Sequence, residues 1–360
     1  MKRACLVLVL ATAGCQEPDR ATEVAASSNR LVDPAPDNDG VLRVLVMHDM
    51  EGLSGQDDPR TFNFRYSDYY ARGQEYLTGD VNAVIAGLYD GGADEVHVLD
   101  AHGSGNRDPD LLVDELDSRA RFNYRNAPPW SPDWLDPNAY DAVAMVGMHA
   151  KTGSRGFASH TYTLGIEIRI NGATVTEPEL YAFTFGKAGV PVIFVSGDDR
   201  LAADLDSMPW IEYVTVKTAT SASTADLRPV AEVRDELRAA ARRALERRDQ
   251  ARAMQIGLPV RAAVRAVPPA SLAVLEGVPG IEYEDETVSF TAASFKEANA
   301  SIGALIGVAT TNYYSMFGEM FRGVPGRDAI WLEYRDRNMR RWLDYESGLW
   351  PPSDSAPGEP

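Results

Sequence analysis

Val44-Leu45-Val46-Met47-His48-Asp49-Met50-Glu51-Gly52-Leu53-Ser54-Gly55 is the stretch that decides the fold expected for this chain. A short apolar run that closes in glycine is typical of a buried strand in a parallel sheet. Ligands of open α/β sheets bind beyond the carboxyl ends of such strands, and Asp49 and Glu51 stand at this end. Because residues i and i+2 of a strand face the same side, the two carboxylates converge. Two like charges held close together favour a cation between them.

Two later apolar runs close in histidines, His102 and His149. If the three strands lie parallel in one sheet, these imidazoles gather with Asp49 and Glu51 at one edge. Carboxylates and imidazoles together form a metal-ligand set that suits Zn²⁺ first, with Mn²⁺, Co²⁺ or Fe²⁺ as alternatives. A carboxylate can also bridge two ions ~3.5–4 Å apart. The sequence therefore predicts a metal site at this edge.

The first fifteen residues predict a lipoprotein signal peptide. Basic residues are followed by an apolar stretch that is too short to span a membrane, and small residues precede Cys15. The segment resembles a lipobox, in which the cysteine becomes the lipidated first residue. Thr12 stands where a lipobox usually has leucine, so plain signal cleavage is the alternative. We expect export to the bacterial cell envelope, with a lipid anchor on the periplasmic side. The outer membrane is the membrane that we favour for this anchor.

Composition limits the remaining possibilities. The 360-residue chain carries a formal net charge of −18, which argues against binding to nucleic acid, since that binding depends on basic contacts to phosphate. With 44% hydrophobic and 24% charged residues, the chain reads as an ordinary soluble protein beyond its signal. Only Cys5 and Cys15 are present, so the mature chain is expected to have no disulfide.

The chain order predicts an α/β fold. A mostly parallel sheet domain flanked by helices carries the metal site, and a smaller α+β domain follows it. Asn171-Gly172 between two β-rich runs predicts a hairpin, and a helix is expected from Lys296 to Tyr313. From Ser315 to Trp350 aromatic and charged residues alternate without a clear period. The expected division is a signal peptide at 1–15, a flexible tether at 16–40, the α/β domain at 41–225, the α+β domain at 226–313, and a C-terminal extension at 314–360 with a disordered end.

Several short motifs occur in an order that resembles the M55 peptidases, which are DppA-like D-aminopeptidases. The resemblance covers about Leu42 to Tyr313. It implies a dinuclear zinc aminopeptidase that releases N-terminal residues, D-residues above all, from short peptides or amino-acid amides. It also implies a ring-like homo-oligomer. The motifs are the Asp49–Gly55 stretch, Asp100-Ala101-His102, Gly147-Met148-His149-Ala150, Ser159-His160 and Gly197-Asp198-Asp199.

The same resemblance implies a role for each site residue. Glu179 competes with Glu177 for the last ligand position, and Glu177 is preferred because it keeps the spacing from Asn171-Gly172. The implied roles are Asp49 as the bridge between two zinc ions, Glu51, His102, His149 and Glu177 as the other ligands, and His160 as the catalytic histidine.

Other readings are open for the protein and for single residues. The protein could be a metallo-amidase or esterase with a non-peptide substrate, or a binding lipoprotein without activity. His160 could pair across the hairpin, and packing is the expected role of His48 and His97. Asp198 and Asp199 could cap the following helix or support the histidines.

Overall fold

The computed structural model describes residues 28–35, 40–103, 106, 108–123, 136–268 and 270–349. The expected signal peptide, Cys15, most of the tether and the last residues of the C-terminal extension lie outside this part. Within it, no helix combines the length and the apolar character needed to cross a bilayer.

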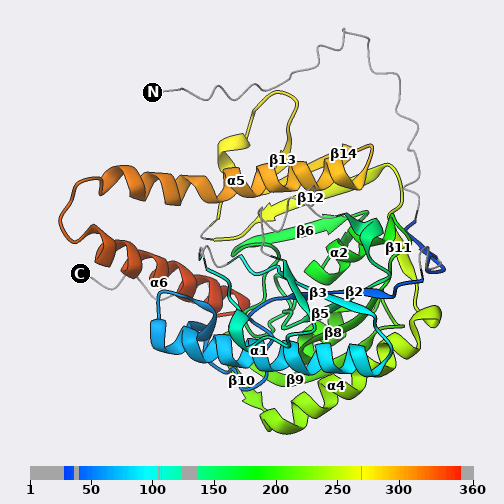
Figure 1. Ribbon diagram of the computed structural model, residues 1–360. Helices are drawn as coiled ribbons and strands as arrows, with labels where there is room; N and C mark the ends of the chain where they lie inside the picture. Colours follow the sequence, from blue (N-terminus) through cyan, green and yellow to red (C-terminus); the bar gives the residue numbers. More distant parts are fainter. Residues whose placement is uncertain are drawn as a thin grey trace, which may run out of the picture.

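A seven-stranded sheet forms the centre of the molecule (Figure 1). Every pair of neighbours is parallel except for the outermost β10, which runs antiparallel to β9. The expected α/β fold with a mostly parallel sheet is therefore confirmed. In spatial order the strands are β10 (Thr224–Leu227), β9 (Glu212–Ser221), β8 (Val192–Asp198), β5 (Ala142–Val146), β2 (Arg43–His48), β3 (Glu95–Asp100) and β4 (Arg121–Asn123).

Both faces of this sheet are buried, as the continuous apolar run of β2 predicts. Val44 and Val46 pack into a cluster with α1 (Ser67–Asp90) and α4 (Val230–Glu246), which lie side by side on one face. Leu45 packs into a second cluster on the opposite face. The alternation follows from the period of two along a strand.

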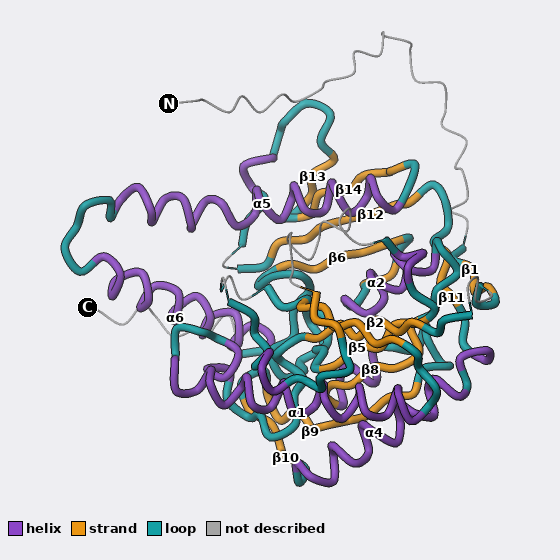
Figure 2. Tube along the Cα trace, in the orientation of Figure 1, coloured by secondary structure: helices purple, strands orange, loops and turns teal. Residues whose placement is uncertain are grey.

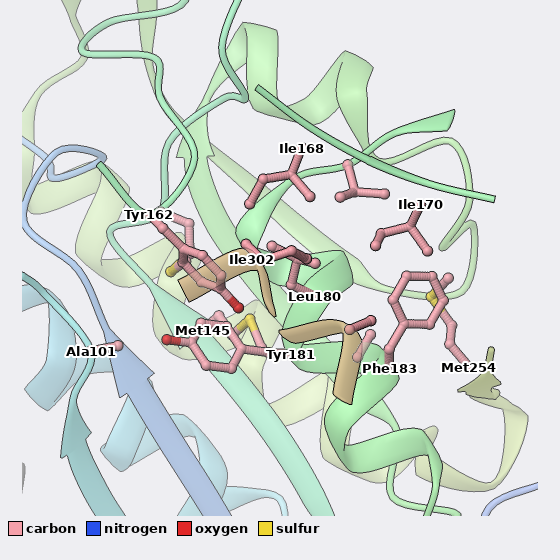
Figure 3. Packing of buried hydrophobic residues seen from close by; sticks show 14 of the residues in the cluster. Ala101, Met145, Tyr162, Ile168, Ile170, Leu180, Tyr181, Phe183, Met254 and Ile302 are labelled. Carbon is pink, nitrogen blue, oxygen red and sulfur yellow. The ribbon is translucent and has the colours of Figure 1, made fainter. Parts of the chain in front are cut away.

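The second cluster joins the sheet to a five-stranded antiparallel sheet and to two helices, α2 (Glu177–Gly186) and α5 (Phe295–Met320). Figure 3 shows Leu180 and Phe183 of α2 near Ile168 and Ile170. The strands of this sheet, in spatial order, are β13 (Glu282–Glu284), β14 (Thr287–Ala292), β12 (Val260–Ala266), β6 (Ile166–Ile170) and β7 (Ala173–Thr174).

The predicted hairpin at Asn171-Gly172 joins β6 to β7 and is confirmed. Both residues adopt positive φ, 51° and 92°, which is what a two-residue hairpin turn requires and what Asn-Gly tolerates. This hairpin belongs to the second sheet, whereas α4 packs against α1 on the first. The two sheets are thus interleaved along the chain, and the expected boundary at residue 225 stays a prediction.

Shorter elements complete the described chain. β1 (Arg30–Val32), a segment we expected within the tether, pairs with β11 (Ala253–Gln255), which gives its backbone groups partners. The remaining elements are α3 (Asp199–Asp204) and the 3₁₀ turns Pro59–Phe62, Val113–Glu115, Pro137–Ala139, Arg248–Gln250 and Ala273–Leu275.

The C-terminal extension is helical where the sequence showed no period. α5 runs past the expected end at Tyr313 to Met320, and α6 (Arg327–Glu346) then runs back below it in the view of Figure 2. Four positions of α6 are buried at helical spacing: Asn338, Trp342, Leu343 and Glu346. Two of these four are polar, so an apolar pattern could not reveal the face that docks.

Candidate metal centre

The ends of β2, β3 and β5 bring the predicted site residues to one edge of the sheet. β2 lies between the other two strands and is parallel to both, as expected. The chain leaving β2 stays in contact with its neighbours, because Asp49 N donates to Val146 O at 2.8 Å and Ala101 N donates to His48 O at 3.0 Å. Asp49, Glu51, His102 and His149 are all buried at this edge.

Two glycines allow the turn after β2 to lie directly on the end of β5. Gly52 N donates to Gly147 O at 2.7 Å. A Cβ on Gly52 would lie 1.9 Å from Met148 O, and one on Gly147 would lie 2.4 Å from Asp49 O. Gly147 also has a φ of +75°, where other residues are strained. These glycines thus hold the carboxylates of one strand end against the histidine of the other.

Asp49, Glu51 and His102 form the first group of candidate ligands, with donor atoms within 4.8 Å of one another. His102 Nε2 lies 3.3 Å from Glu51 Oε1. Its Nδ1 lies 2.8 Å from Asp110 Oδ2, and a carboxylate can only accept there, so Nδ1 carries the proton. Nε2 is therefore the nitrogen that faces a carboxylate oxygen and would bind a metal ion.

His149, His160 and Glu177 form a second group with the same spacing. His149 Nε2 lies 3.3 Å from Glu177 Oε1 and 3.5 Å from Asp49 Oδ2. Asp49 therefore has an oxygen near both groups. This position fits the bridging role that the family resemblance implies for it.

The donor atoms of the second group fit a bound metal ion. His149 Nδ1 donates to Ala150 O at 3.0 Å, so Nε2 is the nitrogen that would bind a metal ion in exchange for its proton. That nitrogen is buried and has no hydrogen-bond partner in the described structure. A ring nitrogen that faces two carboxylates marks a place for a cation, and carboxylate with imidazole is a zinc-type ligand set.

The electrostatics favour positive charge at both groups. Burial lowers the pKa of His102, but Glu51 and Asp110 outweigh burial and raise it well above the usual 6.5. Burial also lowers the pKa of His149, but Glu177 and Asp49 outweigh burial and raise this pKa well above 6.5. Burial and then the charge of Asp49 raise the pKa of Glu51 to about 7. In the absence of a metal ion, protons are held here, and a metal ion would replace them.

His160 lies over the second group. Its ring stacks on His149 with centroids 3.8 Å apart, and Trp342 of α6 meets it edge-on at 5.5 Å. His160 Nδ1 donates to Ala158 O at 2.8 Å, which leaves Nε2 as an acceptor. Burial and the nearby charge of His149 lower the pKa of His160 to about 3, so the ring is neutral at pH 7.

The two candidate glutamates of α2 have different surroundings. Thr176 caps the helix and forms a capping box with Glu179, whose Oε2 accepts from Thr176 N at 2.7 Å. Ser207 Oγ donates to the other oxygen of Glu179 at 2.6 Å. Glu177 instead accepts from Tyr162 N at 2.7 Å and stands in the second group. The structure thus brings Glu177 to the site, while Glu179 is used by the cap.

A small cavity of about 130 Å³ opens over both groups. Its wall combines the carboxylates and histidines with aromatic residues and with one face of α6. The lining residues are Asp49, Glu51, Phe62, Asn63, Ala101, His102, Gly103, His160, Tyr162, Thr163, Leu164, Glu177, Arg335, Met339 and Trp342.

Asp110 supports His102, a role that no pattern in the sequence predicts. It follows a loop rather than a strand, and its other oxygen accepts from the hydroxyl of Tyr70 on α1. Asp198 was the other candidate for supporting the histidines. It instead caps α3 by accepting from Leu201 N at 2.8 Å, and it also accepts from Phe157 N at 2.7 Å. Its role as a helix cap is the one that the structure bears out.

Replacing Asp110 with asparagine should weaken metal binding without abolishing it. The amide keeps a hydrogen bond to His102 Nδ1 but loses the charge that orients and polarises the ring. We expect a loss of ~10–100-fold in zinc affinity, the usual effect of removing such a partner. Competition with a coloured chelator measures it, and an unchanged affinity would mean that Asp110 does not support a ligand.

Proteins similar to this chain in sequence or structure include D-aminopeptidases. The family model for M55 peptidases, described as D-aminopeptidases, matches residues 42–304. A D-aminopeptidase from Bacillus subtilis is 32% identical over 185 residues, which is 51% of this chain and 66% of the relative, just under two thirds of its length. The solved structure of the zinc-dependent D-aminopeptidase DppA from Bacillus subtilis, described as a self-compartmentalizing protease, is also similar. It has a TM-score of 0.68 and 26% identity, and the match covers 74% of this chain and 98% of that one.

Proposed function

This chain belongs to the M55 peptidase family of D-aminopeptidases, and from that premise we propose that it is a zinc-dependent aminopeptidase. The proposed reaction is hydrolysis of the bond that follows the first residue, which is a peptide bond in short peptides and an amide bond in amino-acid amides. The substrates have a free N-terminus, and the preferred first residue is a D-residue. The relatives named as D-aminopeptidases support the reaction class. The proposed preference for D-residues rests on the similarity of this chain to these relatives.

The observation that carries the proposal is the pair of donor groups that share Asp49. We propose one zinc ion in each group. Asp49 would bridge them, Glu51 and His102 would hold the first ion, and His149 and Glu177 the second. The position of His149 Nε2 between two carboxylates, without a hydrogen-bond partner in the described structure, supports a metal in the second group, and the position of His102 Nε2 beside Glu51 supports one in the first.

Zinc bound at these groups would lower the pKa of a water molecule to ~7 and polarise the scissile carbonyl. His160 could carry a proton, although its pKa of about 3 makes it a weak base that would hold the proton only briefly. Because its Nδ1–H is held by Ala158 O, its Nε2 cannot donate to an oxyanion while the ring is neutral, but it can accept a proton. The same nitrogen would then pass the proton to the leaving amine.

The proposed metal site suits a substrate with a free amine. Such an amine could bind one of the proposed zinc ions through its nitrogen lone pair, whereas an acylated nitrogen has no basic lone pair to offer.

A substrate panel tests the assignment. The purified protein should hydrolyse D- and L-dipeptides and aminoacyl amides with a free N-terminus, and a strong chelator should stop it. N-acetylated forms of the same substrates should be left intact. Equal cleavage of acetylated and free substrates would favour a metallo-amidase, and turnover of esters alone would favour an esterase. A zinc-loaded protein that turns over none of them would be a binding protein.

Two further features belong to the proposal. A ring-like homo-oligomer is supported by the solved relative, which is described as self-compartmentalizing. A lipid anchor at Cys15, with export to the periplasmic side of the envelope, is supported by the sequence of the first fifteen residues. Mass spectrometry of the mature N-terminus tests the anchor, since a lipidated Cys15 adds the mass of its acyl chains and a cleaved signal alone adds none.

A further inference from the structure

We propose that Arg335 of α6 binds the free C-terminal carboxylate of the substrate, so that the site selects dipeptides. The inference rests on the proposed aminopeptidase function and names its substrate class. It concerns a part of the chain beyond the match to the family, because that match ends at residue 304 and α6 begins at Arg327.

α6 is built into the wall of the cavity. Arg335, Met339 and Trp342 line it, and their spacing of four and three residues places them on one face of the helix. Trp342 is fully buried and meets the ring of His160. At the end of the helix, Glu346 Oε2 accepts from Gly153 N at 2.8 Å. The helix is therefore fixed against the site and holds Arg335 at its rim.

Arg335 brings the one permanent positive charge among the described residues of the cavity wall. Its guanidinium forms no hydrogen bond or ion pair with the part of the chain that the structure describes, although the side chain is half-buried. The carboxylates do not need it as a counter-ion, because two divalent cations would outweigh the three charges of Asp49, Glu51 and Glu177. The guanidinium is thus available to a ligand.

The chemistry of that ligand follows from the guanidinium group. Its planar fork binds a carboxylate through two parallel hydrogen bonds, and such charge-assisted bonds are strong. A substrate that reaches the metal groups with its amine has one more charged group to offer, the carboxylate at its other end. A C-terminal amide keeps the shape of the substrate but loses this charge.

The size of the cavity then limits the length of the substrate. Each added residue moves the carboxylate outward by roughly 3.3 Å, while Arg335 stays at a fixed place on a docked helix. The cavity of about 130 Å³ is also well below the ~300–1,000 Å³ that ligand pockets usually have. The small cavity therefore favours a dipeptide, the shortest peptide that has both a free amine for the metal groups and a carboxylate for Arg335.

Binding of an uncleavable dipeptide tests the inference. The probe carries CH₂–NH in place of the peptide CO–NH and is made as a free acid and as a C-terminal carboxamide. Calorimetry on the zinc-loaded protein should show that the acid binds ~10–100-fold more tightly than the carboxamide. Arg335→Gln should remove this preference by weakening the acid alone. Arg335→Lys should restore part of it, since it keeps the charge but not the fork.

Arg337→Gln is the matched control. Arg337 lies on the same helix, but its side chain is 67% exposed and pairs with Glu333 away from the cavity. This variant should keep the preference for the acid. In turnover, Arg335→Gln should raise KM for a dipeptide with little change in kcat and leave the dipeptide amide unaffected.

Equal affinity of the wild-type protein for acid and carboxamide would overturn the inference, as would a preference that survives Arg335→Gln. Equal weakening of both probes would show that Arg335 only supports the fold. The two proposals can fail separately. A protein that cleaves dipeptides and amides without preference keeps the aminopeptidase function and loses the role of Arg335. A protein that prefers the acid through Arg335 but cleaves no peptide loses the function alone.

Discussion

Replacing Asp49 with alanine should abolish activity and remove both zinc ions. Asp49 is the residue with an oxygen near each donor group, 3.5 Å from His149 Nε2 and within the cluster of Glu51 and His102. Its loss breaks the bridge and leaves the remaining carboxylates and imidazoles as two incomplete sets. We expect kcat/KM to fall by at least ~10³-fold, since metal activation contributes several kcal/mol. Metal analysis should find little zinc on the variant.

Two other variants make this result specific. His102→Ala should mainly weaken the first group and leave zinc in the second, so it should lose about half of the metal. Asp114→Ala removes an exposed carboxylate on the turn Val113–Glu115 and should change neither zinc content nor rate. If Asp49→Ala keeps both zinc ions and its activity, Asp49 is no bridge and the shared site is wrong.

His160→Ala should lower kcat by ~10²–10⁴, the range expected for a general acid or base, while zinc content stays normal. The reason is the free acceptor at Nε2, which the hydrogen bond from Nδ1 to Ala158 O defines. Stopped assays of a free dipeptide and zinc analysis of the same sample measure the two quantities together.

His97→Ala is the control for this variant. His97 is partly buried on β3, where its ring meets Tyr140 edge-on at 5.5 Å, and it belongs to neither donor group. It should leave kcat unchanged. If His160→Ala loses zinc, then His160 is a ligand, which its place beside His149 and Glu177 permits. If both variants have the same small effect, His160 is structural.

The strand ends could be predicted from sequence because each depends on local pattern. An apolar run predicts each strand, and parallel pairing places the carboxyl ends of the strands at one edge of the sheet. The residues that follow these ends are therefore predicted to lie together: Asp49, Glu51, His102 and His149. The choice of Glu177 over Glu179 as the residue at the site could also be predicted from sequence. Thr176-Glu177-Pro178-Glu179 has the spacing of a capping box, which assigns Glu179 to the helix cap and leaves Glu177 for the site.

The rest of the site depends on contacts that no local pattern encodes. Asp110 reaches His102 from a loop, and Trp342 reaches His160 across 182 positions of the chain. The face of α6 that docks includes the polar residues Asn338 and Glu346, so its helical period is hidden. Glu346 is buried because Gly153 N donates to it, a partner that only the folded chain supplies.

The zinc content of the active protein tests the central claim most directly. Protein purified without chelator should carry close to two zinc ions per chain by elemental analysis. Removal of the metal should abolish hydrolysis of a free dipeptide, and titration with zinc should restore full rate only after the second equivalent. A metal-free preparation that is fully active, or full activity with a single ion per chain, would contradict the account.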